Sequence, residues 1–215
     1  MLQALLGTLM PLDRLSKIKT LMQEKSKNAR SAVPQFWKPS VLIQRITASK
    51  KLQAWLLTPN SLTAKLKTVC PDLHVVVLSE KLETPLWNES QKLGLHRDEQ
   101  AWVRCVLLKC AQKNWVYART IIPNLTNENP WYELQNLGSK PLGEVLFELP
   151  GIQRSEFEFT SNPLGFWPHL MENLADKKQT NRLGFARRSI FKQQNCPLLL
   201  TEVFLPGLVE LDSEK

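Results

Sequence analysis

Three charged residues of this sequence stand where apolar residues would be expected. Arg104 lies in the stretch Trp-Val-Arg-Cys-Val-Leu-Leu, Arg119 in Tyr-Ala-Arg-Thr-Ile-Ile, and Glu202 in Leu-Leu-Thr-Glu-Val-Phe. Because alternate side chains of a β-strand share a face, each charge points to the side where its apolar neighbours point. Moving an ion out of water costs several kcal/mol, so such groups need a partner or a polar cavity.

These charges allow two interpretations. In the first, Arg104 and Arg119 bind an anionic ligand in a closed cavity, and Glu202 accepts a hydrogen bond from a ligand hydroxyl. In the second, Glu202 forms a buried salt bridge with Arg104 or Arg119 that only orders the core.

Two backbone amides also suit an anion. Leu142 follows Pro141, and Leu62 follows Asn60 and Ser61, each at a predicted helix start. Unpaired amides at helix N-termini bind carboxylates well. Most helix starts bind only water or a cap, so these two amides indicate an anion site only in combination with the arginines.

The elements that must position these residues are mainly strands. Six segments are rich in Val, Ile, Phe and Trp, as strands are, and few helices separate them. They are residues 74–78, 101–110, 115–122, 155–160, 183–191 and 198–205. The predicted fold class is therefore α+β, with a six-stranded antiparallel sheet.

Short helices accompany the sheet. The apolar spacing predicts them at residues 52–56, 62–66, 131–137 and 141–147. Asn129 is a good cap for the third, Pro130 suits its first position, and Gly138 suits a left-handed turn at its end.

The net charge of +8 is concentrated near the N-terminus. Residues 1–54 contain ten basic and two acidic side chains, which leaves 18 of each sign in residues 55–215. A neutral body argues against nucleic-acid binding. We expect residues 1–50 to be a basic extension, helical or poorly ordered, and residues 51–215 to be the main folded domain. Two interpretations of this extension are possible: it makes a weak contact with an anionic membrane surface, or it is a solvated segment.

The cysteines and histidines carry no metal or disulfide signature. Cys70, Cys105, Cys110 and Cys196 lack CxxC spacing, so four free thiols in a reducing, cytoplasmic compartment are expected. The three histidines, at positions 74, 96 and 169, lack ligand spacing. No metal and no cofactor are expected. No apolar run reaches the roughly 20 residues of a membrane-spanning helix.

Five blocks of the sequence form a recognisable series. They are residues 102–108, 118–123, 137–143, 187–189 and 197–206. In this order they resemble the chorismate lyase family, over about residues 51–211. The resemblance implies a monomeric bacterial enzyme whose helices close over an internal ligand cavity. It also implies a lyase that converts chorismate to 4-hydroxybenzoate and pyruvate, the first step that supplies the ring of ubiquinone.

The same resemblance implies roles for five residues. By matched motif, the ligand-binding arginine of the family falls on Arg104, its essential carboxylate on Glu202, and a second arginine near the site on Arg119. Backbone contacts to the ligand fall on Leu142 and on Leu62, where the family usually has methionine. We expect Arg104 to anchor a substrate carboxylate and Arg119 to steady the anionic leaving group. Glu202 would orient the ring hydroxyl or assist proton movement.

A non-catalytic alternative shares this fold. The effector domains of some bacterial transcription regulators resemble it and bind small molecules without catalysis. Such domains normally follow a winged helix that binds DNA, and residues 1–50 are short for one. Formation of 4-hydroxybenzoate from chorismate by the pure protein would separate the two hypotheses.

Overall fold

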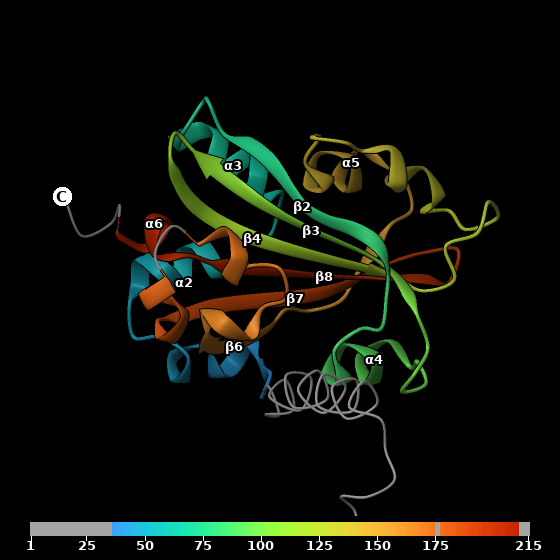
Figure 1. Cartoon of the computed structure of the whole chain (residues 1–215), viewed down its shortest axis with the longest axis horizontal. Helices are drawn as coiled ribbons and strands as arrows, with labels where there is room; N and C mark the ends of the chain where they lie inside the picture. Colours follow the sequence, from blue (N-terminus) through green and yellow to red (C-terminus); the bar gives the residue numbers. More distant parts are fainter. Residues whose placement is uncertain (1–35, 175–176, 211–215) are drawn as a thin grey trace, which may run out of the picture. The chain divides into compact units, whose positions relative to one another are not determined.

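One antiparallel sheet organises the chain (Figure 1). The computed structural model describes residues 36–174 and 177–210. Within them the sheet has eight strands in the order β1-β6-β7-β8-β4-β3-β2, with β5 paired to β7. The strands are β1 Lys38–Pro39, β2 His74–Glu83, β3 Ala101–Cys110, β4 Lys113–Ile122, β5 Gln153–Arg154, β6 Glu158–Pro163, β7 Leu183–Gln193 and β8 Cys196–Phe204. The α+β class and the six predicted strands are confirmed, and the two-residue strands β1 and β5 raise the total to eight.

The middle of the sheet is buried on both faces. Along β3, Trp102, Val106 and Leu108 pack on one side, whereas Val103 and Leu107 pack on the other. Apolar residues therefore fill successive positions of the strand, as expected for strands covered on both sides. The two faces of the sheet have separate cores, and each can hold its own polar groups.

Short helices cover these faces. The α-helices are α2 Lys50–Leu56, α3 Leu62–Val69, α4 Trp87–Leu93, α5 Leu142–Glu148 and α6 Pro206–Val209. The 3-10 helices are η1 Ser40–Arg45, η2 Tyr132–Asn136, η3 Leu164–Phe166, η4 Met171–Asn173 and η5 Lys177–Asn181. Helices α3 and α5 lie beside each other on the side of the sheet that carries Val106 and Leu108 (Figure 1).

Serine caps fix where α2 and α3 begin. The side chain of Ser49 accepts a hydrogen bond from the amide of Leu52, and that of Ser61 accepts one from the amide of Ala64. Each cap satisfies one of the free amides of a first helical turn. The predicted pair of short helices is confirmed, and the cap at Ser61 determines that Leu62 is the first residue of α3.

The predicted helix at 131–137 is a 3-10 helix, η2. Asn129 does stabilise its start: its side chain accepts from the amide of Trp131 at 3.0 Å and donates to the carbonyl of Pro123 at 3.1 Å. Gly138 has a φ of +54°, the left-handed conformation expected of it. The chain then enters α5 at Leu142.

The ordered fold begins earlier than residue 51. Lys38 and Pro39 pair with Phe159 and Glu158 of β6, and η1 follows directly. The expected boundary at residue 50 therefore lies too late, because residues 38–45 belong to the sheet and its cover. The predicted helix over residues 2–22 lies outside the described residues. In the part of the chain that is described, no helix is long and apolar enough to cross a membrane.

One expectation about the cysteines is wrong. Cys70 and Cys110 form a disulfide across 40 residues, and only Cys105 and Cys196 are free. Cys70 directly follows α3 and Cys110 ends β3. Spacing along the sequence gave no sign of this pair, because a helix and a strand bring it together. The bond ties the far end of α3 to the strand that carries Arg104.

Removing this cross-link should destabilise the fold. Closing a loop of this length restricts the unfolded chain, and its loss is worth about 3–4 kcal/mol of unfolding free energy. Chemical denaturation with and without dithiothreitol measures the change. The Cys70→Ser variant should match the reduced protein and ignore the reductant, whereas Cys196→Ser should behave like the wild type. Coincident curves for oxidised and reduced wild type would contradict the bond.

Candidate functional site

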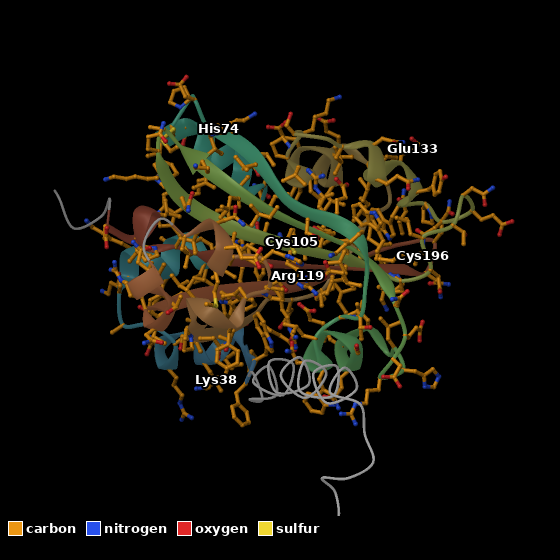
Figure 2. All side chains as sticks on the ribbon, in the orientation of Figure 1. Lys38, His74, Cys105, Arg119, Glu133 and Cys196 are labelled. Carbon is orange, nitrogen blue, oxygen red and sulfur yellow. A yellow bond between two sulfur atoms is a disulfide. The ribbon has the colours of Figure 1, made fainter. Side chains whose placement is uncertain are left out.

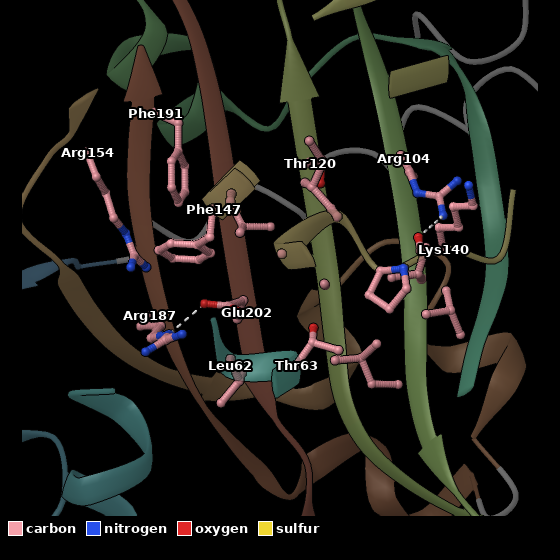
Figure 3. A pocket seen from close by; sticks show the side chains of 18 residues that line it. Leu62, Thr63, Arg104, Thr120, Lys140, Phe147, Arg154, Arg187, Phe191 and Glu202 are labelled. Atoms are coloured by element: carbon pink, nitrogen blue, oxygen red, sulfur yellow. Dashed lines mark hydrogen bonds and ion pairs between the residues drawn. The ribbon is translucent and has the colours of Figure 1, made fainter. Parts of the chain in front are cut away.

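A pocket lies on the sheet face covered by α3 and α5 (Figure 3). Its ionisable lining residues are Arg104, Lys140, Arg154, Arg187 and Glu202. Figure 3 shows Arg104 and Lys140 on one side of the pocket and Arg154, Arg187 and Glu202 on the other. Four of these five groups are cations at neutral pH, so the pocket suits an anion.

Arg104 reaches the pocket from β3 with a side chain that is 3% exposed. Its Nη1 donates to the Glu80 carboxylate at 3.0 Å, and its Nη2 donates to the carbonyl of Gly138 at 2.6 Å. Glu80 is its direct neighbour across the β2–β3 ladder. The guanidinium is thus held by one carboxylate and by the turn that leads into α5.

Glu202 is paired with Arg187, the residue opposite it on β7. The Nε of Arg187 donates to Glu202 Oε2 at 2.6 Å, and its Nη1 donates to the carbonyls of Leu56 at 3.1 Å and Thr58 at 2.7 Å. The alternative interpretation, a salt bridge of Glu202 with Arg104 or Arg119, is therefore wrong. Within the described residues, the other carboxylate oxygen of Glu202 accepts no hydrogen bond and is available to a ligand.

Arg154 completes this side of the pocket. Its Nε donates to the hydroxyl of Ser189 at 2.9 Å, and its Nη1 donates to the carbonyl of Pro59 at 2.7 Å. Burial, together with the nearby charge of Arg187, lowers the pKa of Arg154 to about 10. The group is still a cation at neutral pH.

Arg119 lies on the opposite face of the sheet. It pairs with Cys105 in the β3–β4 ladder, whereas Arg104 pairs with Thr120, so the two arginines point to opposite sides. Its Nε donates to both carboxylate oxygens of Glu89, at 3.1 and 3.2 Å, and its Nη1 to the Cys105 sulfur (Figure 2). The expectation that Arg119 faces the same ligand as Arg104 is wrong.

The electrostatics of Arg119 agree with a structural pairing. Burial by itself would lower its pKa, but Glu89, Cys105 and Tyr117 together outweigh burial, and the pKa is raised well above its ordinary value. Glu83 adds a second carboxylate at 3.6 Å from Nη1 and also accepts from His169. Arg119 is thus a buried cation that is paired with two carboxylates and holds α4 against β4.

The two predicted amide positions do meet at the pocket. Leu62 and Leu142 both line it, as the first residues of α3 and α5. In the described part of the chain, neither amide donates to a protein acceptor. The helix starts approach so closely that a Cβ on Gly143 would lie 3.1 Å from the Ser61 hydroxyl. The structure therefore brings together Arg104, Glu202, Leu62 and Leu142.

Sequence reasoning missed Arg154 and Arg187 as pocket residues. Arg187 stands next to Arg188, and adjacent residues of a strand point to opposite faces, so one arginine had to enter each core. Arg188 bonds to Glu158 on the other face. That parity was a usable signal for Arg187, whereas Arg154 lies in a two-residue strand without any pattern.

No cluster of metal ligands accompanies these groups. Among residues 36–174 and 177–210, no three His, Cys, Asp or Glu side chains gather in a way that could hold a metal ion.

Comparison with known proteins identifies the family. The family model of chorismate lyase matches residues 33–211. The chain is 46% identical over 169 residues to a probable chorismate pyruvate-lyase of Hydrogenovibrio crunogenus, covering 79% of this chain and 89% of the relative. It is 37% identical over 162 residues to a probable chorismate pyruvate-lyase of Aromatoleum aromaticum, covering 75% and 88%.

The chain belongs to the chorismate lyase family, so the resemblance seen in its sequence is confirmed. Its enzyme class is that of a carbon–oxygen lyase. Its fold is also similar to that of the C-terminal domain of PhnF, with a TM-score of 0.50 and 14% identity over 62% of this chain and 83% of that one. This second likeness shows a shared fold alone, and the family match favours the lyase over the effector module.

The Arg119 assignment can be tested through its partner. Replacing Glu89 with Ala removes the nearer of the two carboxylates that face the buried Arg119 and should lower the unfolding free energy by roughly 3 kcal/mol. Turnover per folded molecule should remain, because this pair lies outside the pocket. Glu128→Ala, an exposed carboxylate, is the matched control for thermal unfolding. If the Glu89→Ala variant kept wild-type stability but lost turnover, Arg119 would belong to the active site.

Proposed function

We propose that this pocket binds chorismate and that the chain converts it to 4-hydroxybenzoate and pyruvate. The observation that carries the proposal is that Arg104 and Glu202, on which the family's ligand-binding arginine and essential carboxylate fall, face one pocket from β3 and β8. They come from strands separated only by β4.

The reaction needs no electron carrier. The carbon–oxygen bond of the enolpyruvyl ether breaks, and its electron pair stays on the departing oxygen. A proton leaves the ring carbon that bears the hydroxyl, and the electrons of that bond complete an aromatic ring. The departing enolpyruvate takes up a proton and becomes pyruvate. Aromatisation drives the step, and the protein must hold a dianion and stabilise charge as it moves to the leaving group.

The described residues supply these contacts. Arg104 binds the carboxylate that remains on the ring, and the amides of Leu62 and Leu142 add donors from two helix starts. Glu202 accepts from the ring hydroxyl through the oxygen that Arg187 leaves free. A millionfold acceleration requires roughly 8 kcal/mol of transition-state stabilisation, which buried cations in a low-dielectric pocket can contribute.

Substrate entry requires the cover to move. The free volume of the pocket is about 40 Å³, enough for a few water molecules. Chorismate is larger, so α3 and α5 must separate where Gly143 meets Ser61. Once closed, these helices would keep water from the internal cavity and delay the departure of product.

We propose a cytoplasmic setting from the family match alone, because the Cys70–Cys110 disulfide removes the argument from free thiols. The chain would act there as a monomer without metal or cofactor, would not bind nucleic acid, and would supply the ring of ubiquinone. The basic N-terminal segment would make at most a weak contact with an anionic membrane surface and would stay outside the catalytic step.

Loss of Arg104 tests the site most simply. Arg104→Ala should reduce chorismate turnover at least 1,000-fold, on the order of 4 kcal/mol of transition-state stabilisation, because a buried charge contact is removed. The rate is measured as 4-hydroxybenzoate absorbance with a chelator present. Arg97→Ala, an exposed arginine, is the control. An active, cooperatively folded Arg104→Ala variant would exclude this anchor.

The extension can be tested by deletion. A chain lacking residues 1–33 should keep wild-type kcat/KM, since the family match starts at residue 33 and the pocket uses residues from 62 onward. Removing residues 1–45 should instead destabilise the fold, because β1 and η1 are lost. A folded but inactive shorter deletion would show that the extension takes part in catalysis.

A further inference from the structure

The pocket has a charge imbalance on one side. Arg154 and Arg187 both face Glu202, but Arg187 is the one that pairs with it, so among the described residues the half-buried Arg154 has no carboxylate of its own. On the other side, Arg104 already has Glu80 as its counter-ion. A partly desolvated cation without a counter-ion favours the binding of an anion.

The fold holds both guanidinium groups in place. The carbonyls of Leu56, Thr58 and Pro59, in the segment between α2 and α3, accept from their Nη1 atoms. Both groups also lie over the ring of Phe157, at 3.9 Å for Arg154 and 4.4 Å for Arg187. Such fixed arginines lose little freedom when they bind an anion.

Each guanidinium retains an unused donor. The Nε and Nη1 of Arg154 and of Arg187 make the hydrogen bonds given above, whereas neither Nη2 donates to an acceptor within the described residues. Both side chains line the pocket, so these donors are available to its ligand. Two parallel N–H groups match the two oxygens of a carboxylate.

The substrate has a carboxylate that the ring site does not use. Chorismate carries one carboxylate on the ring and one on the enolpyruvyl group, and only the first stays in 4-hydroxybenzoate. Arg104 on β3 and Arg187 on β7 are separated by β4 and β8, so these two strands lie about 14 Å apart. Long side chains from the two strands can therefore hold the opposite ends of one small dianion.

We propose that Arg154 and Arg187 form a subsite for the carboxylate of the enolpyruvyl group. This inference rests on the proposed function and adds the position of the leaving group. As the ether bond breaks, negative charge builds on the departing enolpyruvate beside these two cations. They thus take the role that Arg119, on the opposite face, cannot fill.

The product gives a sharp test, because 4-hydroxybenzoate lacks the enolpyruvyl carboxylate. Arg154→Met keeps the aliphatic contacts and leaves the Arg187–Glu202 pair intact. Its kcat/KM for chorismate should fall on the order of 100-fold, as expected when a buried hydrogen bond to a charged group is lost. Its Kd for 4-hydroxybenzoate, measured by calorimetry, should stay within about twofold of the wild type. Arg154→Lys should recover part of the loss.

Two control variants frame this measurement. Arg104→Ala should lose both chorismate turnover and 4-hydroxybenzoate binding, and Arg182→Met, outside the pocket, should change neither. Equal losses of turnover and product affinity in Arg154→Met would show a merely structural role and overturn the subsite. Unchanged kcat/KM in that variant would overturn it as well. Absence of turnover in the wild type would instead overturn the proposed function, and the subsite with it.

Discussion

The Arg187–Glu202 ion pair is the interaction on which the pocket depends. It joins neighbouring strands in the centre of the sheet, and its guanidinium also binds two carbonyls before α3. A buried pair of this kind needs further hydrogen bonds, and the two carbonyls supply them through Nη1 of Arg187. The pair therefore fixes the segment that leads to Leu62 relative to β7 and β8, and it orients the free oxygen of Glu202 toward the pocket.

The two faces of the sheet use buried charge differently. On the pocket face, cations outnumber carboxylates and donors stay open to a ligand. On the opposite face, Arg119 is enclosed by Glu89 and Glu83, and the cluster continues to Cys105 and His169. In this second network the charge of the arginine is balanced by protein carboxylates, which explains why a buried arginine alone does not mark a site.

Local sequence patterns were enough to predict the strands. They also predicted which side chains of one strand share a face of the sheet. They could not predict which face two different strands share, because that depends on the register of the β3–β4 hairpin. The ladder sets Arg119 opposite Cys105, with a bulge near Leu108. Since β3 is buried on both sides, its apolar residues gave no signal that separated the two faces.

The remaining differences between the sequence-based predictions and the structure also arise from contacts between distant parts of the chain. The Cys70–Cys110 bond joins residues 40 apart, and Arg154 gains its place by pairing beside Phe191 in a strand too short to show a period. The four residues that the family resemblance assigned to the ligand, Arg104, Glu202, Leu62 and Leu142, line one pocket in the structure. The same resemblance assigned Arg119 to the site, because a motif match does not show on which face of the sheet a side chain lies.

A crystal structure of the chain with 4-hydroxybenzoate would show directly where the ligand binds. We expect the product between β3 and β8, with its carboxylate on Arg104 and its hydroxyl on Glu202, and with α3 and α5 closed over it. Product bound beside Arg119 on the other face, or on the outer surface with the pocket still closed, would contradict this expectation.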